Sequence, residues 1–247
     1  MKPQITAIIQ ARMGSTRLPG KGMMPLAGRP LLGHVFERIQ LTRGVDRVVL
    51  ATCGGDENSV IISLAESMGI PAFIGPEDNV LERFYLAAQE FGGDYIMRVT
   101  GDNPFTDPDY AAMSIDAILK TGSDLCYFSN LPLGTGVGMV KRSALDTAYR
   151  KSDKPHQHEH VTPYIREHPE EFKIEIGEIE IYNPFPELRL TVDTPEDFQL
   201  ADILYRHLYR GKPFPLRDVI SFLEQNPGIA AINSSIKQRP MTHSSSQ

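Results

Sequence analysis

The chain has 247 residues, a net charge of −6 at pH 7 and a hydrophobic content of 41%. This length and composition allow one α/β domain with a sizeable core, which we place at residues 1–236, followed by a polar, flexible tail at 237–247. The acidic balance argues against binding to nucleic acid or to a membrane surface, because such proteins present basic faces or stripes. No segment approaches the roughly 20 apolar residues of a membrane span, so we expect a cytoplasmic protein.

Apolar runs and helical periodicities alternate through the first half of the chain. Asp56 and Asp107 stand where helix N-caps are expected, and Pro108 occupies a first helical position. The alternation predicts an α/β fold with a mostly parallel, doubly wound, Rossmann-like sheet covered on both faces. We expect strands at 5–9, 48–52, 72–74 and 95–99, and helices at 31–39, 56–69, 80–91 and from 108 onward.

The second half of the chain contains more strand-like segments and fewer helical ones. We interpret it as a small arm of strands and helix that completes the sheet. The alternating segment 173–181 could pair two copies of the chain in a homodimer, although a solvated face fits its pattern equally well. We expect strands at 125–128, 173–181 and 188–192, a flexible turn at 134–138 and a helix from Pro195.

The segment 10–21 directly follows the first expected strand and carries three basic residues, two hydroxyl residues and two glycines without a single acid. A loop at this place in an open α/β sheet is where an anionic ligand binds. Its glycines, Gly14 and Gly20, let backbone amides turn inward. Its cations, Arg12, Arg17 and Lys21, supply charge-assisted hydrogen bonds, so the loop favours a polyphosphate ligand.

A Walker A loop is excluded, although Gly14, Gly20 and Lys21 suggest one. That motif needs four residues between its glycines and a Ser or Thr after its Lys. Here five residues intervene and Gly22 follows the Lys. An ordinary solvated turn has the same residue types, but the absence of acids from this loop in an acidic protein favours a binding site.

Two aspartates follow strand-like segments that should end at the same sheet edge as the basic loop. Asp102 lies in a turn, where an Asp can simply bond its own backbone. The residues after Asp193 have structural roles at a helix start, as cap, first-turn proline and first-turn acid, which leaves Asp193 itself without one. Two carboxylates at strand ends suffice for Mg²⁺, because this ion takes one or two protein acids and completes its shell with water and phosphate.

The segment 8–21, together with Gly101-Asp102 and the segment 192–197, resembles the signature of the sugar-acid cytidylyltransferases. The resemblance is closest to the spore-coat polysaccharide biosynthesis branch and runs from about Ile5 to the helix at Pro195. It implies a sheet of the nucleotide-diphospho-sugar transferase type. It also implies transfer of CMP from CTP to the anomeric hydroxyl of a 2-keto-3-deoxy sugar acid, with release of pyrophosphate, in the synthesis of surface polysaccharide or glycan precursors.

The resemblance also implies roles for individual residues. Asp102 and Asp193 would hold Mg²⁺, and the three cations of the basic loop would hold the triphosphate. The implied catalytic residues are Arg12, Arg17, Lys21, Asp102 and Asp193. The implied nucleotide-binding residues are Ile9, Gln10, Ala11, Arg12, Gly14, Ser15, Arg17, Lys21, Arg98, Thr100 and Gly101.

The acceptor side is less well defined. Glu159 and His160 begin a segment that resembles one near the acceptor in the spore-coat branch, and this resemblance implies that they belong to the acceptor pocket. Three histidines at 156, 158 and 160 suggest zinc, but neighbouring histidines on a Lys- and Pro-containing segment are more often solvated. The chain departs from the family pattern at Gly136 and Gly138, where relatives usually have acids, so the pattern does not identify the acceptor.

Three other functions remain open. One is a nucleotidyltransferase for another nucleotide or for a sugar phosphate. A second is a glycosyltransferase, which would use an Asp-x-Asp metal pair; Asp107-Pro108-Asp109 matches it in letters but stands where a helix cap is expected. The third is a nucleotide-binding relative that has lost its acceptor site, which Gly136 and Gly138 suggest.

Overall fold

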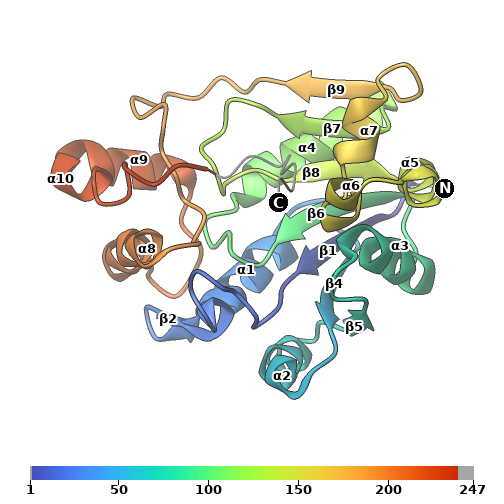
Figure 1. The fold of residues 1–247 in the computed structure, drawn as a ribbon. Helices are drawn as coiled ribbons and strands as arrows, with labels where there is room; N and C mark the ends of the chain where they lie inside the picture. The colour runs from blue at the N-terminus through green and yellow to red at the C-terminus, as the bar shows by residue number, and fades with distance from the viewer. Residues whose placement is uncertain (1, 239–247) are drawn as a thin grey trace, which may run out of the picture.

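The computed structural model describes residues 2–238, in which seven strands form one sheet in the order β5-β4-β1-β6-β8-β7-β9 (Figure 1). The expected mostly parallel sheet is confirmed, since only β8 runs antiparallel to its neighbours β6 and β7. A two-stranded ribbon accompanies this sheet. The strands are β1 (Ile5–Gln10), β2 (Pro25–Leu26), β3 (Arg29–Pro30), β4 (Arg47–Cys53), β5 (Ala72–Gly75), β6 (Tyr95–Thr100), β7 (Leu125–Phe128), β8 (Gly138–Lys141) and β9 (Ile174–Gly177).

Helices cover both faces of the sheet and divide the core into two clusters. One face packs against α1 (Leu31–Gln40), α2 (Ser59–Ser67), α4 (Pro108–Thr121), α8 (Pro195–Leu208) and α9 (Leu216–Gln225). The other packs against α3 (Val80–Phe91), α5 (Arg142–Lys151) and α7 (Pro163–Glu167), and α6 (Pro155–Glu159) lies beside α3 (Figure 1). Three short helices complete the set: η1 (Lys21–Met23), η2 (Asp56–Asn58) and α10 (Pro227–Ala230).

The central strand β1 is buried on both sides, as a parallel strand between two helical layers must be. Ile5, Ile8 and Ile9 all have no exposed surface. Ile8 belongs to the cluster of α3, α5 and α7, whereas Ile5 and Ile9 belong to the other cluster. The alternation of strand side chains therefore joins both layers to one strand.

Two of the three expected helix starts are confirmed. Asp107 accepts hydrogen bonds from the first amides of α4, and Thr194 forms a capping box with Asp197 at α8. The expectation that Asp56 caps a helix is wrong, because Asp56 begins the short helix η2 and α2 starts only at Ser59. The side chain of Asn58, in the N-cap position of α2, is instead engaged by the amide of Met13 in the basic loop.

The second half differs from expectation in three segments. The expected turn at 134–138 leads into β8, which the sequence did not predict. The expected strand at 173–181 shortens to β9. The segment 188–192 is buried but is not a strand, and makes a single bridge, from Arg189 to Leu133. Its amides bond to two different loops, Leu190 to Leu133 and Val192 to Asp102, so no continuous ladder forms.

Part of the expected tail, 239–247, lies outside the described residues. Within residues 2–238, the helices are all too short or too polar to cross a membrane.

Candidate active site

The carboxyl ends of β1 and β6 meet at one point of the sheet edge. Gln10 and Thr100 pair in register, and the amide of Gly101 donates to the carbonyl of Gln10 at 2.8 Å. A Cβ at position 101 would lie 2.7 Å from the Ala11 Cβ and 3.0 Å from the Gln10 carbonyl oxygen, so only glycine fits. The basic loop and the turn that carries Asp102 therefore start in contact with each other.

The segment before Asp193 joins the same edge through its backbone. The amide of Val192 donates to the carbonyl of Asp102 at 2.9 Å. The Lys21 ammonium then contacts Asp102 Oδ2, Asp193 Oδ1 and the Val192 carbonyl, each at 2.8 Å. The structure thus brings together one residue from the start of the chain, one from its middle and one from its last quarter. All three N–H donors of Lys21 have a partner.

Asp193 is surrounded by positive charge. Arg17 lies 3.1 Å from Asp193 Oδ1, and Arg189, which is 4% exposed, contacts Asp193 Oδ2 at 2.7 Å. Burial alone would raise the pKa of Asp193, but the charges of Lys21, Arg17 and Arg189 outweigh it and hold that pKa below its ordinary value. Burial would likewise lower the pKa of Lys21, yet Asp102 and Asp193 hold it above its ordinary value. Lys21 and Asp193 therefore both stay ionised at neutral pH.

The basic loop is held by its own backbone and by Asn58. The amide of Met13 donates to Asn58 Oδ1 at 2.9 Å, and the amide of Leu18 donates to Ser15 Oγ at 3.3 Å. Gly20 adopts a φ of +71°, which turns the chain into the helix that carries Lys21. Gly14 has open space around its Cα, so a side chain there would meet no neighbour.

The comparisons with known proteins were decisive for the family. A family model described as cytidylyltransferase matches residues 6–225. The chain belongs to the cytidylyltransferase family. It is 35% identical over 231 residues to the spore coat polysaccharide biosynthesis protein SpsF of Bacillus subtilis, covering 92% of this chain and 96% of SpsF.

Two further relatives agree. A 3-deoxy-manno-octulosonate cytidylyltransferase of Anaeromyxobacter dehalogenans is 31% identical over 163 residues, covering 62% of this chain and 65% of that protein. The structure of a cytidylyltransferase from Leptospira borgpetersenii superimposes with a TM-score of 0.88 at 28% identity, covering 96% of this chain and 100% of that one. The resemblance to sugar-acid cytidylyltransferases, and with it the expectation of a nucleotidyltransferase, is confirmed.

Several side chains of this cytidylyltransferase have buried polar atoms without a partner among residues 2–238. These atoms include Gln10 Oε1, Arg98 Nε and Asn103 Oδ1, all near the ends of β1 and β6. The Asn103 amide nitrogen donates to Thr100 Oγ1 at 2.7 Å. Buried polar groups are normally satisfied, so such a group of orphan atoms indicates a place where a ligand binds. Ile9, by contrast, is fully buried and can contribute only through its backbone.

Arg12 points to a different part of the site from Arg17 and Lys21. It pairs with Glu77 at 2.9 Å, and within residues 2–238 it forms no ion pair with either aspartate. Arg12 and Glu77 line a cavity of about 530 Å³, together with Glu159 and His160, the two implied acceptor residues. Burial lowers the pKa of His160, and the positive charge of Arg98 lowers it further.

The alternative metal motifs have structural explanations. His156 contacts Glu167 Oε1 at 2.5 Å, and the only group of three or more potential metal ligands in the described part of the chain is His168, Glu170 and Glu171 at the surface. Asp107 caps α4 and also accepts the amide of Leu216, so it is not free to act in an Asp-x-Asp pair.

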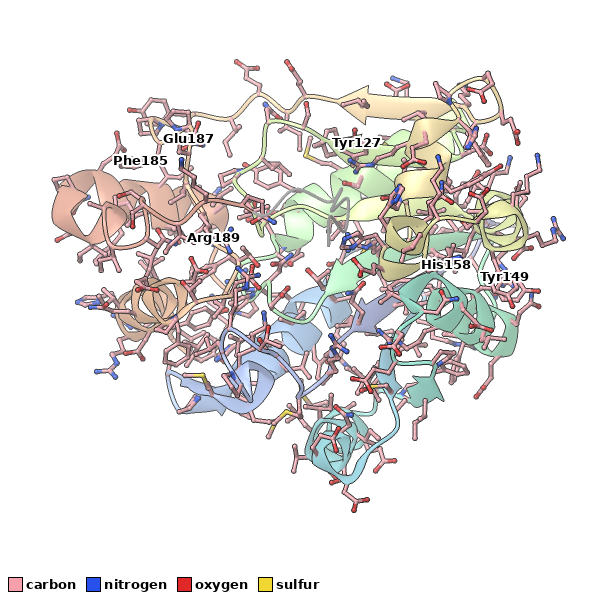
Figure 2. All side chains as sticks on the ribbon, in the orientation of Figure 1. Tyr127, Tyr149, His158, Phe185, Glu187 and Arg189 are labelled. Carbon is pink, nitrogen blue, oxygen red and sulfur yellow. The ribbon has the colours of Figure 1, made fainter. Side chains whose placement is uncertain are left out.

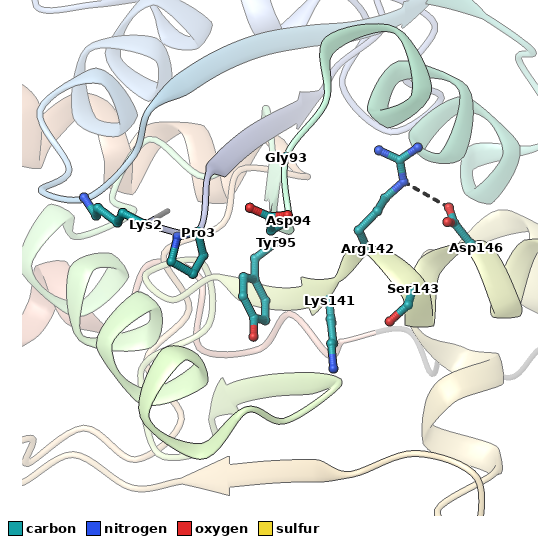
Figure 3. A pocket seen from close by; sticks show the side chains of 9 residues that line it. All are labelled: Lys2, Pro3, Gly93, Asp94, Tyr95, Lys141, Arg142, Ser143 and Asp146. Atoms are coloured by element: carbon teal, nitrogen blue, oxygen red, sulfur yellow. Dashed lines mark hydrogen bonds and ion pairs between the residues drawn. The ribbon is translucent and has the colours of Figure 1, made fainter.

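A cavity of about 700 Å³, larger than the one lined by Arg12 and Glu77, lies at the opposite edge of the sheet (Figure 3). Lys2 and Pro3 precede β1, Tyr95 begins β6, and Arg142 begins α5 and bonds to Asp146. In α/β sheets ligands bind outside the carboxyl ends of the strands, which is the edge of Lys21 and the aspartates. Size alone therefore does not identify the site.

Sequence reasoning missed three residues that shape this site. Arg189 holds Asp193 and lies just before α8 (Figure 2). Its place four residues before Asp193 was the available signal. Asn103 was detectable only as the neighbour of Asp102, and Asn58 had no signal, because its contact with Met13 joins positions 45 residues apart.

Proposed function

We propose that this protein is a Mg²⁺-dependent cytidylyltransferase that transfers CMP from CTP to the anomeric hydroxyl of a 2-keto-3-deoxy sugar acid and releases pyrophosphate. The observation that carries the proposal is the convergence of Arg17 and Lys21 with Asp102 and Asp193 at one sheet edge. Membership of the cytidylyltransferase family supports cytidine as the base. The names of two relatives, one for 3-deoxy-manno-octulosonate and one for spore coat polysaccharide, support a sugar acid and a surface glycan.

The donor set at this edge fits Mg²⁺. One oxygen of Asp102 and one of Asp193 each lie 2.8 Å from a single nitrogen atom, so the two carboxylates converge on one small cation. Both are hard oxygen donors, which Mg²⁺ prefers, and two protein carboxylates leave room for water and phosphate. Asp102 and Asp193 would hold the ion, which when bound there would neutralise charge on the phosphate oxygens.

The residues of the basic loop would carry the remaining charge of the triphosphate. Arg17 and Lys21 already lie beside the two aspartates, so phosphate groups near the metal would be within reach of their donors. In the reaction the sugar hydroxyl gives up its proton to solvent and its oxygen bonds to the α-phosphorus, while the bond from that phosphorus to the pyrophosphate oxygen breaks. These cations would stabilise the charge that develops. Main-chain groups near Gln10 and Thr100 would meet the base and ribose.

Pyrophosphate release tests the proposal directly. Four nucleotides, CTP, UTP, GTP and ATP, are each offered with a panel of eight- and nine-carbon keto-sugar acids in Mg²⁺. We expect turnover with CTP and at least one acid, reduced by at least about 100-fold in Asp102→Asn and in Asp193→Asn. Asp109→Asn, the same change on the exposed first turn of α4, is the matched control and should leave turnover unaltered. Turnover of UTP or GTP but not CTP would contradict the proposal.

A second function deserves a test because Gly136 and Gly138 stand where relatives usually carry acids. A relative that binds nucleotide but has lost its acceptor site would be stabilised by CTP, so that its melting temperature rises. It would release no pyrophosphate with any acid of the panel. The same experiment therefore separates the two functions.

A further inference from the structure

Three neighbouring strands present a row of positions to the face of the sheet that α7 covers. Arg98 of β6 pairs directly with Gly138 of β8. On the other side of β8, Cys126 pairs with Met139, so the next positions in that register are Tyr127 and Gly138. Directly opposed residues point to the same face of a sheet. Ile96, two residues before Arg98, packs in the cluster of α3, α5 and α7, which fixes the face to which the row belongs.

The middle of this row is open space. A Cβ added to Gly138 would meet no heavy atom within 4 Å, and the φ of Gly138 does not lie in the left-handed region. The absence of a side chain there is therefore not required by the backbone or by close packing. Arg166 of α7 reaches over the far end of the row, where its guanidinium lies 4.2 Å from the centre of the Tyr127 ring.

The two arginines at this space lack anionic partners within residues 2–238. Neither side chain makes an ion pair or a hydrogen bond there, and the Nε of Arg98 is buried. Burial lowers the pKa of Arg98; the charge of Asp102 opposes this effect, and the smaller effect of Arg166 adds to it. The Asp102 carboxylate is itself engaged by Lys21. Two mutually repelling cations around an open space favour the binding of an anion between them.

We propose that Arg98 and Arg166 bind the carboxylate of the acceptor in the space over Gly138, an assignment that rests on the proposed transfer to a sugar acid. Guanidinium groups match the two oxygens of a carboxylate in planar, bidentate pairs. In the ring form of a 2-keto acid the anomeric carbon bears both the carboxylate and the hydroxyl. Fixing the carboxylate thus orients the hydroxyl for attack.

This carboxylate site, formed by Arg98 and Arg166 over Gly138 and called the receptor below, is separate from the triphosphate site. Arg17 and Lys21 engage Asp193, whereas Arg98 and Arg166 stand over the strands β6, β8 and β7. A carboxylate side chain at position 138 would lie between the two arginines and would occupy the place of the ligand.

Direct binding measurements test the receptor. Calorimetry of the full chain uses two probes, 3-deoxy-manno-octulosonate and N-acetylneuraminate, each as the free acid and as its methyl ester. We expect an acid to bind and its ester to fail, and Arg166→Gln to weaken acid binding roughly 10- to 100-fold while CTP affinity stays unchanged. Equal binding of acid and ester, failure of both acids to bind the unaltered protein, or unchanged acid affinity in Arg166→Gln would each overturn the receptor.

A second variant pair tests the charge of the space without any ligand. Gly138→Asp should raise the melting temperature relative to Gly138→Asn, because only the Asp side chain pairs with the arginines, and this gain should shrink in the Arg166→Gln background. A Gly138→Asp protein no more stable than Gly138→Asn would overturn the receptor. Loss of CTP affinity in Arg166→Gln would also overturn it, assigning these cations to the triphosphate. Acid binding without pyrophosphate release would instead refute the proposed transfer and leave the receptor standing.

Discussion

Among the described residues, Asp193 forms three ion pairs, more than either Lys21 or Asp102, and its position depends on the buried Arg189. Arg189 donates through one nitrogen to Asp193 and through Nε to Asp197, which is 2% exposed. Asn233 donates to Asp197 at 2.8 Å as well. A buried guanidinium thus ties the proposed metal ligand to the first turn of α8.

Replacing Arg189 by Met should strongly destabilise the protein. The Asp197 carboxylate would remain buried without a cation, and breaking one partner of a buried pair costs about 3–5 kcal/mol. Urea unfolding measures the free energy of unfolding. Arg206→Met is the matched control, because Arg206 also pairs with an aspartate four residues away but is exposed, and little change is expected. If the two substitutions change the free energy of unfolding equally, the buried pairs of Arg189 with Asp193 and Asp197 add no stability of their own.

At the level of elements, α1 is joined to the β2 segment and to α8 through one buried histidine. His34 Nε2 lies 2.8 Å from the carbonyl of Leu26, and the ring packs 4.3 Å from Tyr205 and 4.8 Å from Tyr209. Burial lowers the pKa of His34 from its ordinary 6.5 to about 4. In the folded protein at neutral pH, His34 is therefore neutral and its Nε2–H donates to the carbonyl of Leu26.

This histidine should make the protein less stable in acid. Between pH 6.5 and pH 4 the unfolded chain binds a proton at His34 that the folded protein does not, so stability falls as the pH falls through this range. We expect a loss of about 3 kcal/mol by pH 4 relative to His34→Gln, whose amide can donate to Leu26 without titrating. Chemical unfolding at a series of pH values measures the difference. If the free energy of unfolding changes with pH in the same way for the two proteins, the lowered pKa of His34 is refuted.

Elements with strong local signals were predictable, and those made by long-range pairing were not. The helix at 80–91 has the predicted bounds because Leu81, Phe84 and Ala88 recur at helical spacing and Asn79 caps it. β8 was missed because it has only four residues, begins in the glycine-rich turn at 134–138, and owes its strand conformation to pairing with β6 and β7. The segment 188–192 has the composition of a strand, but no neighbouring strand was there to pair with it.

The same distinction applies to the site. Asp102 and Asp193 were predictable because each follows a strand-like segment and precedes a recognisable turn or helix start. The contact of Asp102 with Lys21 follows from the parallel order of β1 and β6, which the alternation of elements had implied. The contact of Asp193 does not, because it depends on the backbone hydrogen bond from Val192 to Asp102. Arg98 and Arg166 could not be paired from sequence, because two strands and three helices lie between them in the chain and nothing local indicates that α7 lies over β7.

On the scale of the molecule, two cationic regions lie near the carboxyl ends of the central strands, one with Arg17 and Lys21 and one with Arg98 and Arg166. Asp102 lies between them. The region of Arg17 and Lys21 is bound to the aspartates, and the region of Arg98 and Arg166 is open. The fold places the first next to the α8 layer and the second under α7. A transfer from CTP to a sugar acid requires a binding region for each of the two anions, and under the proposed function the first region would hold the triphosphate and the second the sugar acid.

The measurement that tests this account most directly is the Mg²⁺-dependent part of the CTP affinity. Calorimetric titrations with Mg²⁺ and with a chelator are compared for the unaltered protein, Asp102→Asn, Asp193→Asn and the double variant. If the two carboxylates hold one ion, each single variant should lose the Mg²⁺-dependent part of its CTP affinity. The double variant should then lose no more CTP affinity than either single variant does. Mg²⁺ enhancement that persists in either single variant, or losses that add in the double variant, would contradict a shared metal site.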